Sequence, residues 1–156
     1  MKYAIPSAVI LAAILVAACT KPAAPPKTFP AKADSHHQVG TFNDTEKVIR
    51  AVPGQTGAVV FGPYVSMEPG RYSATFDVTG SVPTAGTELG AVDVSEASAI
   101  NPENILAKSP LKASPSPQKI TVEFSVASRD AKYEYRVWSN GVGIVEFRGV
   151  QISALE

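Results

Sequence analysis

The chain has 156 residues, of which 14 are Lys or Arg and 14 are Asp or Glu, so its formal net charge at neutral pH is zero. It has no basic excess to attract a phosphate backbone, and nucleic acid is not an expected partner. Because Cys19 is the only cysteine, neither an internal disulfide nor a thiolate metal site can stabilise the fold. The length corresponds to one domain held together by its apolar core.

The N-terminus has the pattern of a secretory signal, in which Lys2 precedes an apolar run that ends in small residues. This run is too short for a membrane-spanning helix, which needs roughly 20 apolar residues. Val16-Ala17-Ala18-Cys19 resembles the lipobox of bacterial lipoproteins. The resemblance implies removal of residues 1–18, a diacylglyceryl thioether on Cys19 and acylation of its amine, for example by palmitate. An ordinary signal peptide with a chance cysteine is the alternative.

The residues after Cys19 predict where the protein lies. Thr20 replaces the aspartate associated with inner-membrane retention, so the resemblance implies an outer-membrane lipoprotein that faces the periplasm or the cell surface. Residues 19–39 are rich in proline and predict a semi-extended linker. At about 3.1 Å per residue it would hold a domain of residues 40–156 roughly 50–60 Å from the bilayer. His36 and His37 lie in this linker without a carboxylate or cysteine at ligand spacing, so no metal site is expected there.

After Gly40 the sequence consists of short apolar runs separated by Gly, Pro and Ser. Apolar and polar residues alternate in these runs, as in 72–78 and 120–126, which is typical of antiparallel strands with one buried face. We therefore predict an all-β fold, a single antiparallel β-sandwich of about eight strands with jelly-roll topology. The predicted strands are residues 47–52, 57–62, 71–79, 88–95, 104–109, 118–127, 132–139 and 143–153.

Residues 133–148 predict a hairpin around Asn140-Gly141. A two-residue turn would mix polar and apolar side chains on each face, which a half-buried sheet forbids. A three- or five-residue loop, with Gly141 or Gly143 at positive φ, pairs Arg136 with Glu146 and Glu134 with Arg148. One face then carries the core residues Tyr133, Tyr135, Val137, Val145 and Phe147. The other face carries Glu134, Arg136, Trp138, Glu146 and Arg148.

Trp138 lies beside these charge pairs in the predicted hairpin. An aromatic ring can stack on the apolar face of a sugar while charged neighbours hydrogen-bond to the hydroxyl groups. We therefore expect Trp138, Arg136 and Glu146 to form a carbohydrate-binding surface. The alternative is that a neighbouring loop covers Trp138 and that the charges form a solvated sheet face.

Three short runs occur in order along the domain: Gly62-Pro63-Tyr64, Pro69-Gly70-Arg71-Tyr72 and Tyr135-Arg136-Val137-Trp138. With them, residues 48–153 resemble the jelly-roll, carbohydrate-binding-module-like domains found beside bacterial glycosyltransferases and methyltransferases. The resemblance implies carbohydrate binding, with Tyr64 as a second sugar platform, although a packing role in its turn is the alternative. Some jelly-roll modules also hold a structural calcium ion, for which Asp77, Asp93 and Glu96 are candidates by residue type alone.

The sequence contains no nucleophile motif, phosphate-binding loop or metal-ligand set. Both histidines lie in the expected linker, which leaves the domain without the usual general base. We therefore expect a non-catalytic protein without a cofactor. It would be a membrane-anchored binding module for a cell-envelope glycan or polysaccharide. The alternative is a structural or assembly lipoprotein that binds another envelope protein.

Overall fold

The computed structural model describes residues 24–97 and 104–156 of the chain, so the expected signal and Cys19 lie outside the described residues. All elements in the described part are strands, which confirms the all-β prediction. Within these two ranges, no helix long and apolar enough to cross a membrane is present. The ten strands are β1 (Lys27–Pro30), β2 (Thr41–Asn43), β3 (Val48–Ala51), β4 (Thr56–Val60), β5 (Gly70–Ser81), β6 (Glu88–Ala97), β7 (Asn104–Lys112), β8 (Gln118–Val126), β9 (Lys132–Asn140) and β10 (Ile144–Ala154).

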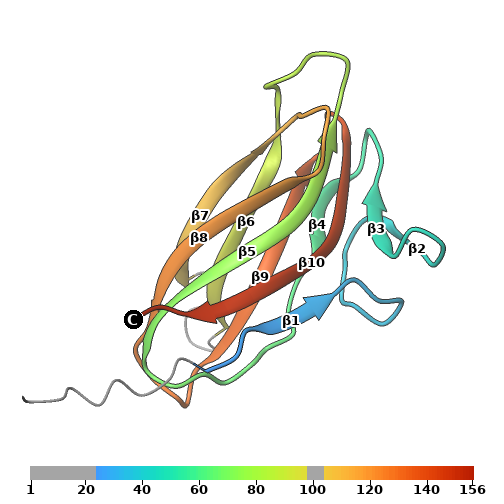
Figure 1. Cartoon of the computed structure of the whole chain (residues 1–156). Coiled ribbons are helices and arrows are strands. Elements are labelled where there is room, and N and C mark those ends of the chain that lie inside the picture. Colours follow the sequence, from blue (N-terminus) through green and yellow to red (C-terminus); the bar gives the residue numbers. More distant parts are fainter. Residues whose placement is uncertain (1–23, 98–103) are drawn as a thin grey trace, which may run out of the picture.

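The strands form two antiparallel sheets that face each other, as the two layers in Figure 1 show. The six-stranded sheet has the order β2-β3-β10-β5-β8, and β1 lies beside β10 next to β3. The four-stranded sheet has the order β4-β9-β6-β7. This arrangement confirms the antiparallel β-sandwich, with ten strands where about eight were expected.

Alternation along the strands builds the core between the sheets. In β5 the side chains of Ala74, Phe76 and Val78 are buried, while the intervening positions are partly exposed. The five core residues predicted around the turn at Asn140-Gly141 are all buried, which confirms that part of the prediction. The largest fully buried side chains of the core are Tyr133, Tyr135, Phe76, Ile49, Leu89 and Leu111.

The predicted hairpin at residues 133–148 is wrong, because β9 and β10 belong to different sheets. The three-residue connection contains Gly141 at φ +80°, as expected, but it carries the chain across the sandwich. The connection from β3 to β4 crosses beside it, and Gly54 N donates to Gly141 O at 2.8 Å between the two crossings. A crossing and a hairpin bury the same apolar residues, so alternation alone cannot distinguish them.

Part of the expected linker is instead part of the sandwich. Lys27–Pro30 pairs with β10, in register from Lys27 opposite Ile152 to Pro30 opposite Gly149. Ala31 is buried, and its N–H donates to Arg148 O at 2.8 Å. His36 forms an isolated bridge with Phe61. Residues 27–39 therefore pack against the sandwich and do not form a separate linker.

Candidate functional site

The outer face of the four-stranded sheet carries the only tryptophan of the chain. Trp138 on β9 lies between Ala58 of β4 and Ala91 of β6 in the strand register. These small neighbours leave room for the indole, which is partly exposed. Gly90 allows β6 to approach at this point, since a Cβ there would lie 1.8 Å from Trp138 O. The small residues around Trp138 thus accommodate its indole ring on the surface of the sheet.

A buried charged cluster lies next to the indole. Asp93 on β6, which is 1% exposed, accepts hydrogen bonds from Arg136 Nε at 2.6 Å and from Trp138 Nε1 at 2.9 Å. Arg136 Nη1 is 3.5 Å from Glu134 Oε1. The guanidinium carbon of Arg136 is 5.2 Å from the centre of the Trp138 ring, within the range of a cation–π contact. These contacts fix the orientation of the indole before any ligand arrives.

Tyr64 extends this surface from the segment that follows β4. Val65 exchanges two backbone hydrogen bonds with Tyr133, which fixes the segment against β9. Burial and the neighbouring Glu134 carboxylate raise the pKa of the Tyr64 hydroxyl above its ordinary value, and Arg136 lowers it. The Tyr64 backbone has φ +62°, an uncommon conformation for a bulky residue and one that clusters at functional sites. Tyr64 is 39% exposed, so its ring is available to a ligand.

Both expected ion pairs are absent, and one predicted site residue, Glu146, lies elsewhere. Glu146 is on the outer face of the six-stranded sheet, where it pairs with Arg50 at 2.6 Å and with Arg148 at 3.1 Å. Arg136 pairs with Asp93 and Glu134 instead of Glu146. The structure therefore brings Trp138, Arg136 and Tyr64 together, and it excludes Glu146 from their surface.

The three calcium candidates do not converge. Asp77 pairs with Lys119 on the six-stranded sheet, and Asp93 is occupied by Arg136 and Trp138. Glu96 lies at 3.4 Å from the Asn104 side-chain amide. Among residues 24–97 and 104–156, no group of three or more His, Cys, Asp or Glu side chains could hold a metal ion.

Asp93, which we expected only as a calcium candidate, is part of the cluster beside Trp138. Its position between Val92 and Val94 in a largely buried strand is the signal that could have identified it. A carboxylate in such a strand needs a cationic or hydrogen-bonding partner. The partner comes from β9, which is adjacent in space and 43 residues away in sequence.

Comparison with known proteins identifies the fold. The sequence matches no protein-family model and no curated protein. One similar solved structure is the carbohydrate-binding module CBM6cm-2 from Cellvibrio mixtus lichenase 5A in complex with cellotriose. The two share 13% identity over 83% of this chain and 98% of that chain, with a TM-score of 0.50. Another is the apo form of CBM1 of BiXyn10A, with 14% identity over 83% of this chain and 97% of that chain and a TM-score of 0.50. The chain therefore has a β-sandwich fold like that of carbohydrate-binding modules.

Proposed function

We propose that this protein is a non-catalytic, lipid-anchored module that binds a cell-envelope glycan on the outer face of its β4-β9-β6-β7 sheet. The observation that carries the proposal is the fixed, partly exposed Trp138, hydrogen-bonded to Asp93 and in contact with Arg136. The fold shared with carbohydrate-binding modules supports the same conclusion.

The chemistry of this face suits a sugar ring. The indole of Trp138 provides an apolar surface for stacking, and it is held in one orientation, so little conformational freedom is lost on binding. Glu134, which lies beyond Arg136 along β9, and the neighbouring Tyr64 hydroxyl provide an acceptor and a donor on the same face. The guanidinium of Arg136 is already engaged by two carboxylates, which give the cluster a net negative charge. The face therefore favours neutral over acidic glycans.

The test is Trp138→Leu, which keeps an apolar side chain but removes the stacking surface. We expect glycan-array binding to fall at least tenfold, while circular dichroism shows the same β-sheet content. Arg148→Ala, on the opposite sheet, is the matched control and should leave binding unchanged. Unchanged glycan binding in Trp138→Leu would overturn the proposal. Co-purification of an envelope protein without any glycan signal would support an assembly lipoprotein instead.

We also propose that Cys19 carries the lipid and that the module is retained at the outer membrane. The lipobox-like run and the single cysteine support this anchoring. Mass spectrometry of the mature N-terminus should find a triacylated or diacylated Cys19. Cys19→Ser should remove the acyl mass and release the protein from the outer-membrane fraction. A mature chain without acyl mass would contradict the anchoring but not the glycan binding.

A further inference from the structure

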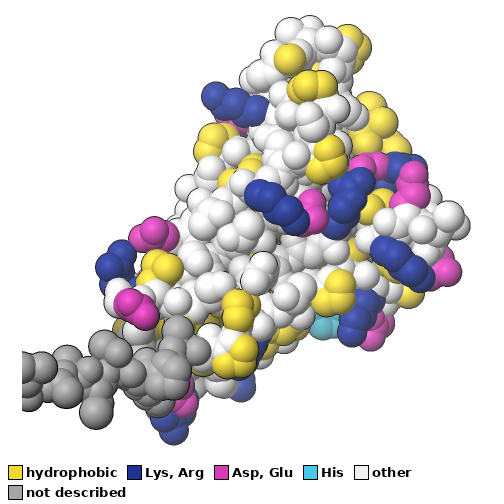
Figure 2. All heavy atoms as spheres, viewed as in Figure 1, with side chains coloured by type: hydrophobic (Ala, Val, Ile, Leu, Met, Phe, Trp, Pro, Cys, Tyr) yellow, Lys and Arg dark blue, Asp and Glu magenta, His cyan; other side chains and the backbone are white. Residues whose placement is uncertain are grey.

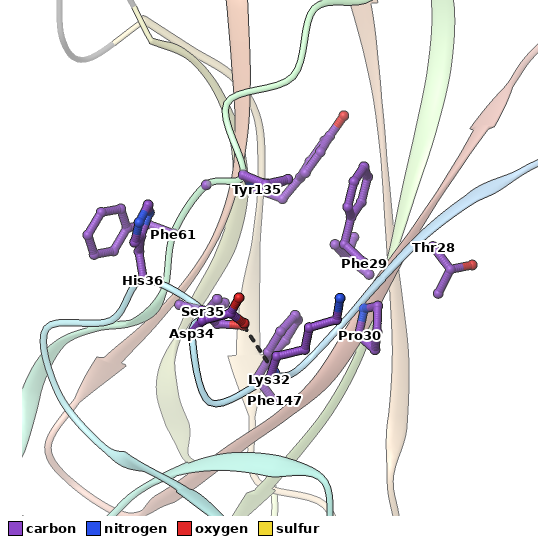
Figure 3. Close-up of a pocket in the computed structure, with 14 residues that line it drawn as sticks. Thr28, Phe29, Pro30, Lys32, Asp34, Ser35, His36, Phe61, Tyr135 and Phe147 are labelled. Atoms are coloured by element: carbon purple, nitrogen blue, oxygen red, sulfur yellow. Dashed lines mark hydrogen bonds between the residues drawn. The ribbon is translucent and has the colours of Figure 1, made fainter.

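A separate pocket of about 280 Å³ lies between β1, the loop that follows it and the segment after β4. The rings of Phe29 and Tyr135 lie side by side on one side of this pocket, and those of His36 and Phe61 lie on another (Figure 3). Buried core residues, among them Phe147 and Val150, close its inner end. The volume is just below the ~300–1,000 Å³ range that is typical of ligand pockets. A chain can therefore enter the pocket but cannot pass through it.

Two side chains of opposite charge, Lys32 and Asp34, line the pocket. Lys32 and Asp34 belong to a tight turn, in which Lys32 N donates to Ser35 Oγ and Ser35 N donates to Lys32 O, both at 3.1 Å. Within the described parts of the chain, neither side chain forms an ion pair. One ammonium and one carboxylate next to apolar rings offer a donor and an acceptor with no net charge. This combination suits the hydroxyl groups of a neutral sugar.

The pocket and the Trp138 face meet at His36. The His36 ring lies 5.5 Å from the Phe61 ring, which lines the pocket, and 6.1 Å from the Tyr64 ring, which lies beside Glu134. Gly62 O accepts a hydrogen bond from Tyr135 N at 2.9 Å, so the backbone between the two sites is fixed to β9. A ligand that leaves the pocket past His36 therefore reaches Tyr64 and the outer face of the sheet.

We propose that the pocket receives the terminal residue of a neutral glycan whose next residues cross Tyr64 and Trp138. This inference rests on the proposed function and adds to it that the module recognises chain ends. Because the inner end of the pocket is closed, an internal stretch of a long polymer can occupy only the Trp138 face. A hexasaccharide occupies both sites, and a monosaccharide occupies the pocket alone.

The chain supplies one intrinsic reporter for each site. Trp138 is its only tryptophan, so intrinsic indole fluorescence reports on the sheet face, and the imidazole resonances of His36, which lines the pocket, report on the pocket. The full-length protein, purified in detergent, would be titrated with xylohexaose and cellohexaose and with xylose and glucose. We expect at least one hexasaccharide to shift both the Trp138 fluorescence and the His36 resonances. The corresponding monosaccharide should shift only the His36 resonances.

Two variants separate the inference from the function on which it rests. Asp34→Asn combined with Lys32→Met should weaken hexasaccharide binding about tenfold and abolish the His36 shift, while Trp138 fluorescence still responds at high concentration. Lys27→Met combined with Asp44→Asn, which are exposed and outside the pocket, is the control. A hexasaccharide that shifts Trp138 fluorescence but never His36, or full affinity in the pocket variant, would overturn the terminal pocket and leave the sheet face intact. If neither hexasaccharide binds the unmodified protein, the terminal pocket is also overturned.

Discussion

The two outer faces of the sandwich carry similar residue types but use them differently. On the six-stranded sheet, acidic and basic side chains lie next to one another in solvent, as Figure 2 shows, and the side chains of Arg71 and Glu123 are 63% and 62% exposed. On the four-stranded sheet, the side chains of Arg136 and Asp93 are 10% and 1% exposed. Exposed pairs contribute at most about 1 kcal/mol, whereas removing one partner of a buried pair costs several kcal/mol.

The four-stranded sheet contains a buried ion pair that reduces stability unless both partners are present. Burying the Asp93–Arg136 pair costs desolvation free energy that an exposed pair avoids. Asp93 also accepts the Trp138 N–H, so the same group that neutralises Arg136 fixes the indole. On the opposite face the Thr75 and Thr121 hydroxyls, 2.9 Å apart, form a neutral contact in solvent. The buried pair that fixes Trp138 supports the proposal that the four-stranded face binds the ligand, whereas the pairs on the other face are solvated.

The largest effect that tests this comparison is on stability. Asp93→Ala would leave Arg136 buried with Glu134 as its remaining partner, and we expect a loss of about 3–5 kcal/mol in the free energy of unfolding. Asp77→Ala removes a carboxylate from the exposed pair with Lys119 and should cost less than about 1 kcal/mol. Urea unfolding of both variants measures the difference. Equal losses would show that the two faces are not distinct.

A smaller effect is expected on binding. Glu134→Gln weakens the acceptor beside Tyr64, and we expect glycan affinity to fall about tenfold, or about 1.4 kcal/mol. Glu146→Gln, the equivalent change on the six-stranded sheet, should leave affinity unchanged because its partners are Arg50 and Arg148. Calorimetric titration with a glycan identified on the array measures both. Weaker glycan binding by Glu146→Gln would show that Glu146 contributes to the binding site after all.

The smallest effect concerns alkaline pH. Burial, with the neighbouring Tyr72 and Tyr133, raises the pKa of the Tyr135 hydroxyl well above its ordinary value. Above pH ~10 the unfolded state therefore loses this proton while the folded state keeps it, so stability falls as pH rises, by about 0.8 kcal/mol at pH 10.5. Tyr135→Phe should remove this part of the decline. Tyr72→Phe, on the six-stranded sheet, should remove less, because Tyr72 is only partly buried. Urea unfolding between pH 8 and 10.5 measures this decline in the free energy of unfolding. An equal decline in the two variants would contradict the prediction.

The predicted ranges match eight of the ten strands, β3 to β10, and all of these except β7 have several buried side chains that the residue pattern records. β1 and β2 were not predicted, because they are short, polar and close to Pro or Gly. Their formation depends on pairing with β10 and β3 rather than on their own composition. The sequence analysis placed Trp138 and Arg136 on one face correctly. It misplaced Glu146 because opposite charges close in sequence can each find partners on distant strands, here Asp93 and Arg50.

If Cys19 carries a lipid as proposed, the pairing of β1 with β10 limits how far the module can extend from the membrane. Lys27 is already in the sheet, so a lipid on Cys19 would be separated from the sandwich by residues 20–26 alone. Even fully stretched, seven residues span about 25 Å. The module would then sample only a thin layer of envelope immediately above the lipid headgroups. With the proposed anchor, glycans that terminate close to the bilayer surface would be within its reach, and distant layers of the cell wall would not.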